Sequence, residues 1–126
     1  MAAQPQRWYT VEEYLAYERT QTEKHHYLDG HIYAQAGTSQ RHNLLLTNTL
    51  GSLYVQLRKR PCNVYPSDMR VKAPATQLYT YPDLTVVGGQ HEFDDTYRDT
   101  ITNPTIIIEI LSPSTERYDR GRKFQH

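Results

Sequence analysis

The stretches Tyr81-Pro82-Asp83-Leu84-Thr85-Val86-Val87 and Ile106-Ile107-Ile108-Glu109-Ile110-Leu111 each place one carboxylate within β-branched, apolar sequence. Such sequence is typical of buried strands, and an ionised carboxylate is costly there unless a metal, a cation or water meets it. Pro82 suits the first position of a strand, where its missing N–H does no harm. The chain between the two acids leaves room for a hairpin-like return, so we expect the two strands to be neighbours.

Two acids at neighbouring strand ends would offer the hard oxygen ligands that Mg²⁺ prefers, with water and a substrate phosphate completing the coordination. The residues alone leave an alternative open. Asp83 could simply cap a turn and Glu109 could pair with an arginine, since Pro-Asp is a common dipeptide.

Composition limits the classes of protein to consider. A chain of 126 residues and 14.8 kDa predicts a single domain over residues 1–126. Its 14 Lys and Arg balance its 14 Asp and Glu, so net charge indicates no partner. The single Cys62 excludes an internal disulfide and a cysteine-rich zinc site, which fits a reducing compartment. Neither a signal peptide nor a membrane-spanning run is visible, so we expect a cytoplasmic protein without membrane contact.

Local patterns predict two helices and a hairpin in the first half of the chain. Thr10 and Glu13 form a capping-box pattern before a short helix. Asp29-Gly30 between apolar residues is the strongest short signal for a hairpin. A long helix is predicted over residues 39–58, because leucines recur along one face. These leucines are Leu46, Leu50, Leu53 and Leu57.

The second half of the chain reads as strands. Alternation over residues 64–73 predicts one strand with a polar face. The strand that carries Glu109 is almost continuously apolar, so we expect it to be central and buried on both faces, with a polar loop before it. Ser112-Pro113-Ser114-Thr115 would then cap a basic helix over residues 116–126.

Several motifs together resemble the Uma-type family of restriction-endonuclease-like proteins, in the PD-(D/E)XK nuclease superfamily. The resemblance covers essentially the whole chain. It rests on Tyr27-Leu28-Asp29-Gly30, Ala36-Gly37, Asp68-Met69-Arg70-Val71-Lys72, Tyr81-Pro82-Asp83, Asn103-Pro104-Thr105, the run from Ile108 to Thr115, Tyr118-Asp119-Arg120-Gly121 and Lys123.

This resemblance implies an α/β (α+β) fold with a restriction-endonuclease-like core, in which a mixed β-sheet is flanked by helices. It also implies a metal-dependent endodeoxyribonuclease. Asp83 would be the acid of the PD motif and Glu109 the second acid, both binding Mg²⁺ (or Mn²⁺) for hydrolysis of DNA phosphodiester bonds.

The catalytic lysine of the superfamily departs from the expected place. The pattern would put it two residues after Glu109, where this chain has Leu111. In this family the lysine looks migrated to the following helix, which nominates Lys123, and Lys72 is the alternative. Either lysine could orient or deprotonate the attacking water, or could be an ordinary surface lysine.

Two histidines and the length of the chain are relevant to whether this chain is an active enzyme. Relatives usually carry Glu where this chain has His26, so His26 stands where a third metal ligand is expected, although imidazole suits Mg²⁺ poorly. His42, at the start of the long helix, matches a common family position and is either catalytic or only a helix-start residue. Family members usually continue further, so we expect the fold to be incomplete at its C-terminus.

DNA phosphates are the expected partners of the basic residues near the site. These are Arg117, Arg120, Arg122 and Lys123, with Arg70 as a further candidate. Two other interpretations remain: a catalytically inactive module that keeps the nuclease fold, or a truncated fragment that binds DNA or a partner chain. A second copy of this chain, giving a homodimer, is one such partner.

Overall fold

The computed structural model describes residues 7–73 and 76–111, which form two helices and eight strands. In chain order these elements are α1 (Val11–Glu18), β1 (His25–Leu28), β2 (His31–Ala34), α2 (Gln40–Leu57), β3 (Cys62–Tyr65), β4 (Arg70–Lys72), β5 (Tyr79–Thr80), β6 (Leu84–Gly88), β7 (Thr100–Ile101) and β8 (Ile106–Ile108).

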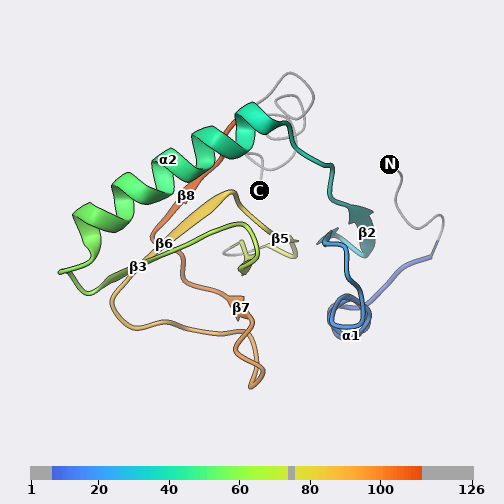
Figure 1. Cartoon of the computed structure of the whole chain (residues 1–126). Coiled ribbons are helices and arrows are strands. Elements are labelled where there is room, and N and C mark those ends of the chain that lie inside the picture. The colour runs from blue at the N-terminus through green and yellow to red at the C-terminus, as the bar shows by residue number, and fades with distance from the viewer. Residues whose placement is uncertain (1–6, 74–75, 112–126) are drawn as a thin grey trace.

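The strands form two sheets. One has five strands in the order β2-β1-β5-β4-β7, and the other has three in the order β3-β6-β8. β4 and β7 pair in parallel and the remaining pairs are antiparallel, so the five-stranded sheet is mixed. α2 runs alongside β3, β6 and β8, whereas α1 lies beside the β1–β2 hairpin (Figure 1). The mixed α+β fold is thus confirmed, although the described strands divide between two sheets.

The N-terminal predictions are confirmed in detail. The Thr10 hydroxyl accepts a hydrogen bond from the Glu13 N–H, and the Glu13 carboxylate accepts one from the Thr10 N–H, which completes the capping box of α1. The hairpin turn has Asp29 at φ 49° and Gly30 at φ 87°, the left-handed pair that a two-residue turn requires. A Cβ on Gly30 would also meet the ring of the exposed Trp8 side chain, which would then have to move.

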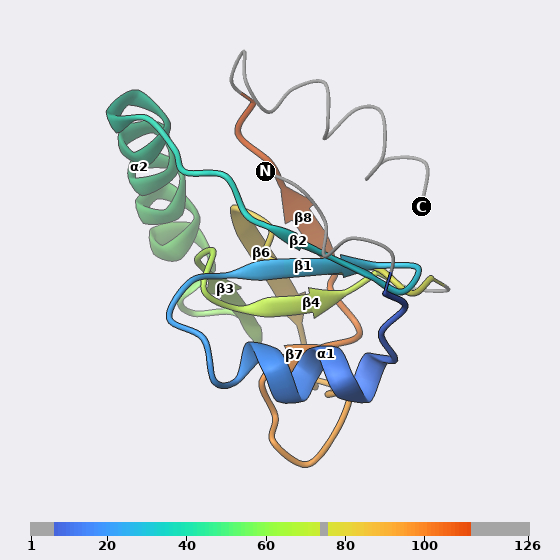
Figure 2. The same cartoon turned by 90° about the vertical axis from the view of Figure 1, so that its right-hand side faces the viewer.

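Two clusters of buried side chains hold the helices and sheets together. α1 covers one face of the five-stranded sheet (Figure 2), and the first cluster lies between them. It consists of Tyr14, Leu15, Tyr27, Ile32 and Tyr79. The second joins the two sheets through Val71, Val87 and Ile101. β6, which follows Asp83 directly, is therefore fixed by buried packing.

The predicted strand over residues 64–73 is wrong as a single element. β3 ends at Tyr65 and β4 begins at Arg70 in the other sheet, and between them the Met69 N–H bonds the Pro66 carbonyl at 3.2 Å. Its expected polar face is also wrong, because Arg70 is buried. A proline and a turn interrupted the alternation, and ion pairing allowed the arginine to enter the interior.

The predicted burial of the strand with Glu109 is wrong as well. Within the described part of the chain, β8 pairs only with β6, and Ile106 and Ile107 are 51% and 41% exposed. An apolar run shows that a strand can be buried, but neighbouring elements decide whether it is. The predicted polar loop before it also contains a short strand, β7, which pairs with β4.

A buried polar network links α1 to the sheet that leads to Asp83. The Glu18 carboxylate accepts hydrogen bonds from the His25 N–H at 2.7 Å and from the Tyr81 hydroxyl at 2.6 Å. Arg70 donates to the same Tyr81 hydroxyl at 3.0 Å and pairs with Asp99 at 2.9 Å. Burial raises the pKa of Tyr81 above its usual range, so its hydroxyl stays protonated and can donate.

Asp99 closes this network at the surface. Arg19 donates two hydrogen bonds to its carboxylate, at 2.9 and 3.0 Å. These bonds, with the charge of Arg70, lower the pKa of Asp99 to about 2. Arg70 is therefore a buried residue with a carboxylate partner, which corrects the expectation that it contacts DNA phosphates.

Neither described helix has the length and apolar character that crossing a membrane requires.

Candidate functional site

The pairing of β6 with β8 places the two predicted acids side by side. Asp83 directly precedes β6 and Glu109 directly follows β8, and the strands are antiparallel with Leu84 opposite Ile108. The start of one strand and the end of the other consequently lie at the same edge of the sheet. The expectation that these strands are neighbours is confirmed.

Hydrogen bonds connect the two acids directly. The Asp83 N–H donates to Glu109 Oε1 at 3.2 Å, and the Ile110 N–H donates to Asp83 Oδ2 at 2.7 Å. Each carboxylate thus receives a backbone donor from the strand that carries the other. This reciprocal arrangement helps to fix both side chains.

His42 of α2 is the third residue of this cluster. Its Nε2 lies 3.1 Å from Asp83 Oδ2, and its side chain is 6% exposed, against 15% for Asp83. Ser39 caps α2 and accepts a hydrogen bond from the His42 N–H, so the ring sits in the first turn of the helix. The partial positive charge of a helix N-terminus therefore lies beside Asp83.

The contact of His42 with Asp83 could not be inferred from the sequence alone. The available signals were its position behind a capping serine and its match to a family position, and both also fit a residue that simply begins a helix. Within the described residues its Nδ1 is buried and has no hydrogen-bond partner. A tautomer with the proton on Nε2 donates to Asp83 and leaves Nδ1 unprotonated.

The chemistry of this cluster fits a hard divalent cation. The hydrogen bonds that His42 and Ile110 make to the Asp83 carboxylate both involve Oδ2, so among the described residues Oδ1 has no donor. Carboxylate oxygens suit Mg²⁺ and Mn²⁺, and such ions commonly bind through one or two carboxylates plus water and phosphate. No group of three or more His, Cys, Asp or Glu that could hold a metal occurs in residues 7–73 and 76–111. The pair therefore resembles an open site rather than a closed cage.

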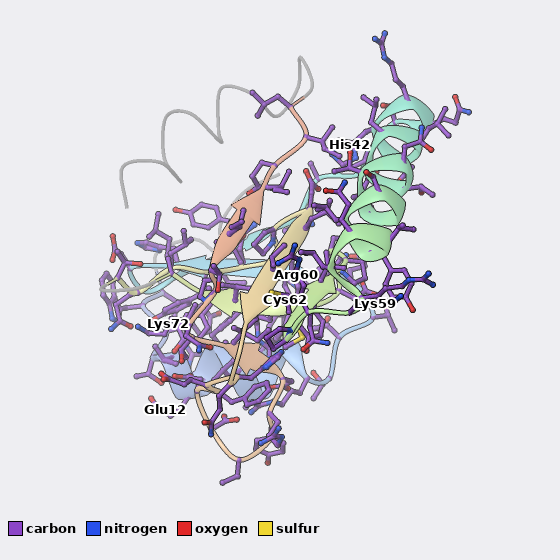
Figure 3. The ribbon with its side chains drawn as sticks, turned by 90° about the vertical axis from the view of Figure 1, so that its left-hand side faces the viewer. Glu12, His42, Lys59, Arg60, Cys62 and Lys72 are labelled. Carbon is purple, nitrogen blue, oxygen red and sulfur yellow. The ribbon has the colours of Figure 1, made fainter. Side chains whose placement is uncertain are left out.

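The other predicted site residues lie elsewhere or outside the described chain. Lys72 pairs with Tyr79 across β4 and β5 and shares a sheet face with Arg70, which is the face that α1 covers. Figure 3 shows Lys72 well apart from His42. The structure therefore does not bring Lys72 to the two acids. Lys123 and the basic residues Arg117, Arg120 and Arg122 lie outside the described residues.

His26 is buried on β1 and pairs with Tyr33 on β2, with their rings 5.8 Å apart. Its neighbours His25 and Tyr27 face α1, where they contact Glu18 and Tyr14. Side chains alternate along a strand, so His26 points to the opposite face of the sheet. Its role as a metal ligand stays a prediction.

Sequence comparison identifies the family to which the chain belongs. The Uma2 family, described as "Putative restriction endonuclease", matches residues 11–126. The chain belongs to the Uma2 family. The resemblance seen in the sequence motifs is thereby confirmed, and Asp83, Glu109 and His42 all lie within the matched region.

Two relatives of this Uma2 chain come from Synechocystis sp. (strain ATCC 27184 / PCC 6803 / Kazusa). "Uncharacterized protein slr1290" is 40% identical over 114 residues, which cover 90% of this chain and 59% of that protein. "Uncharacterized protein sll1609" is 36% identical over 115 residues, which cover 91% of this chain and 65% of that protein. The chain thus spans about three fifths of the length of these relatives.

A solved structure shares the fold. It is described as the crystal structure of a putative nuclease belonging to DUF820 from Anabaena variabilis ATCC 29413. The TM-score is 0.69 at 18% sequence identity, and the match covers 93% of this chain and 66% of that chain. This likeness shows that the chain shares its fold with that structure.

Proposed function

We propose that this Uma2 chain carries the metal-binding acids of an endodeoxyribonuclease that hydrolyses DNA phosphodiester bonds with Mg²⁺ or Mn²⁺. The observation that carries the proposal is the meeting of Asp83 and Glu109 at one edge of the β6–β8 pair, 26 positions apart in sequence. The family description and the fold of the DUF820 nuclease support the same class of reaction.

The chain's own residues prepare the site for this chemistry. The Ile110 N–H and His42 both contact Asp83 Oδ2 and so fix the orientation of the carboxylate. Its other oxygen, Oδ1, then has a defined position from which it could bind a cation. The Asp83 N–H similarly holds Glu109 Oε1. A divalent cation bound by these carboxylates would supply positive charge to a phosphate in the transition state. Orientation before binding means that little reorganisation is needed during the reaction.

Metal binding and cleavage can be tested on the same protein. We expect calorimetry to detect Mn²⁺ and Mg²⁺ binding, and supercoiled plasmid to be nicked only when one of these ions is added. Excess EDTA should stop the nicking, and Ca²⁺ should support binding with much slower cleavage. Absence of both a binding signal and nicking at high protein concentration would contradict the proposed function.

The catalytic lysine is assigned by comparing two matched substitutions. Lys123→Met should slow nicking by roughly a hundredfold, the range expected when a general acid–base group is removed. Lys72→Met should change it less than about twofold, because Lys72 lies on the sheet face that α1 covers. Both changes remove one charge and keep most of the side-chain length. The reverse ranking would transfer the role to Lys72.

A catalytically inactive nuclease-fold module is the second candidate. It is favoured by His26, which stands where the resemblance to the family leads one to expect a glutamate as the third acid. Such a module would bind DNA in a manner that does not depend on Mg²⁺. DNA binding without metal-dependent nicking would select this candidate.

A further inference from the structure

A second site lies at the end of α2 remote from His42. A cavity of about 430 Å³ opens there between α2, β3 and the end of β6. Its polar lining comes from Tyr54, Arg58, Arg60 and Asn63, and its apolar walls include Leu57 and Val64. Figure 3 shows His42 at one end of α2, and Lys59, Arg60 and Cys62 gathered at the other.

The cavity is built largely from a stretch of sequence that contains basic residues and no acidic ones. Residues 30–67 contain no Asp or Glu, although the chain has 14 of them, and they carry Arg41, Arg58, Lys59 and Arg60. Within the described part of the chain, none of these four cations forms an ion pair. Elsewhere in the described chain Arg7, Arg19, Lys24 and Arg70 each pair with a carboxylate, whereas Lys72 and Arg98 do not. Three of the four cations in residues 30–67 follow one another at the cavity end of α2, and two of them, Arg58 and Arg60, line the cavity, which suits a polyanion.

Tyr54 adds an exposed aromatic ring, which a site that binds only phosphate would not need. Its side chain is 57% exposed although it lines the cavity, and Arg58 follows it by one helical turn on the same side of α2. An exposed aromatic ring beside guanidinium groups is how proteins stack an unpaired base while binding its phosphates. The Asn63 amide offers a donor and an acceptor to such a base.

We propose that this cavity binds a nucleotide of single-stranded nucleic acid, with the base on Tyr54 and the flanking phosphates on Arg58 and Arg60. This inference rests on the proposed function only in that both concern one nucleic-acid ligand. At 1.5 Å per residue, about 24 Å of helix separates His42 from Arg58, or roughly seven nucleotides of a strand with a stacked rise of 3.4 Å. α2 would thus connect the cavity to the acids as one rigid body.

The test measures binding without cleavage. Fluorescence anisotropy with a labelled 20-nucleotide single strand, in EDTA, is carried out over a series of NaCl concentrations. Arg58→Ala/Arg60→Ala should reduce the slope of log K against log salt by about 1.4, or about 0.7 for each phosphate that is no longer neutralised. Arg7→Ala/Arg98→Ala removes the same charge elsewhere and should leave the slope nearly unchanged.

Tyr54 gives a second, independent readout. Tyr54→Ala should weaken binding by roughly fivefold to a hundredfold with no change in salt slope, and Tyr54→Phe should bind as the wild type does, because stacking needs only the ring. Equal slopes for the two double variants would overturn the proposal, as would wild-type protein that fails to bind the single strand. A dimer in light scattering that Tyr54→Ala dissociates would also overturn it, because the surface would then be a protein interface.

These outcomes separate the inference from the proposed function. Metal-dependent nicking that persists in a protein without single-strand binding would leave the nuclease proposal standing and reject the cavity. Single-strand binding that depends on Arg58 and Arg60, in a protein that never nicks DNA, would support the cavity proposal and reject the nuclease proposal.

Discussion

Asp83→Asn and Glu109→Gln should each lower the rate of metal-dependent DNA nicking by roughly a thousandfold, equivalent to about 4 kcal/mol of transition-state stabilisation. Both substitutions keep the shape of the side chain and remove its negative charge, which a bound cation requires. Neither should unfold the protein. Without metal, the melting temperature should stay equal or rise, because one of two adjacent like charges is gone.

Asp68→Asn is the matched control for this prediction. It also removes one carboxylate charge, but the Asp68 side chain is 90% exposed and pairs with Lys24 at the surface. Its nicking rate and Mn²⁺ affinity should equal those of the wild type. Calorimetry should show Mn²⁺ affinity falling in the two site variants alone. Nicking at wild-type rates by both site variants would reject the assignment of the acids.

Glu18→Ala should lower the free energy of unfolding by about 3–5 kcal/mol, the range for breaking a buried charged network by removing one partner. The Glu18 carboxylate receives the His25 N–H, the Tyr81 hydroxyl and a contact from His25 Nδ1 at 2.9 Å. Truncation leaves the His25 N–H and the Tyr81 hydroxyl proton without their acceptor in the interior.

Urea unfolding followed by circular dichroism measures this destabilisation directly. Glu12→Ala, on the exposed side of the same helix, is the control and should cost well under 1 kcal/mol. Figure 3 shows the Glu12 side chain at the periphery of the molecule. A decrease below about 1 kcal/mol for Glu18→Ala would show that water replaces the carboxylate and that the network contributes little to stability.

The buried network of Glu18, Tyr81 and Arg70 also helps to position Asp83, because Tyr81 is close to Asp83 in the chain. Tyr81 lies two positions before Asp83, and its hydroxyl is held from two sides by Glu18 and Arg70. The segment that delivers Asp83 to the start of β6 is therefore anchored in the interior on the α1 side. On its other side, Asp83 is held by Ile110 and His42. α1 and α2 thus contribute to the position of one carboxylate from opposite sides of the fold.

Local sequence was sufficient wherever short-range physics decides the conformation. The Thr10–Glu13 box, the Asp29-Gly30 turn and the helix that begins after Ser39 were all predictable, because a cap, a left-handed turn or an apolar face is encoded within a few residues. The pairing of the strands beside Asp83 and Glu109 was predictable for a related reason. Both acids flank apolar strands whose connection permits an antiparallel return.

Tertiary structure alone decided which face and which neighbour each element has. It divided residues 64–73 between two sheets, buried Arg70 beside the Tyr81 hydroxyl and left Ile106 and Ile107 exposed. It also brought the first turn of α2 onto Asp83, 41 positions away along the chain, which no local pattern specifies. The sequence by itself determined which residues could form helices, turns and a pair of neighbouring acids. Burial and side-chain contacts depend on segments far apart in the chain, so only the assembled fold determined that Arg70 is an interior residue and that His42 joins the acids.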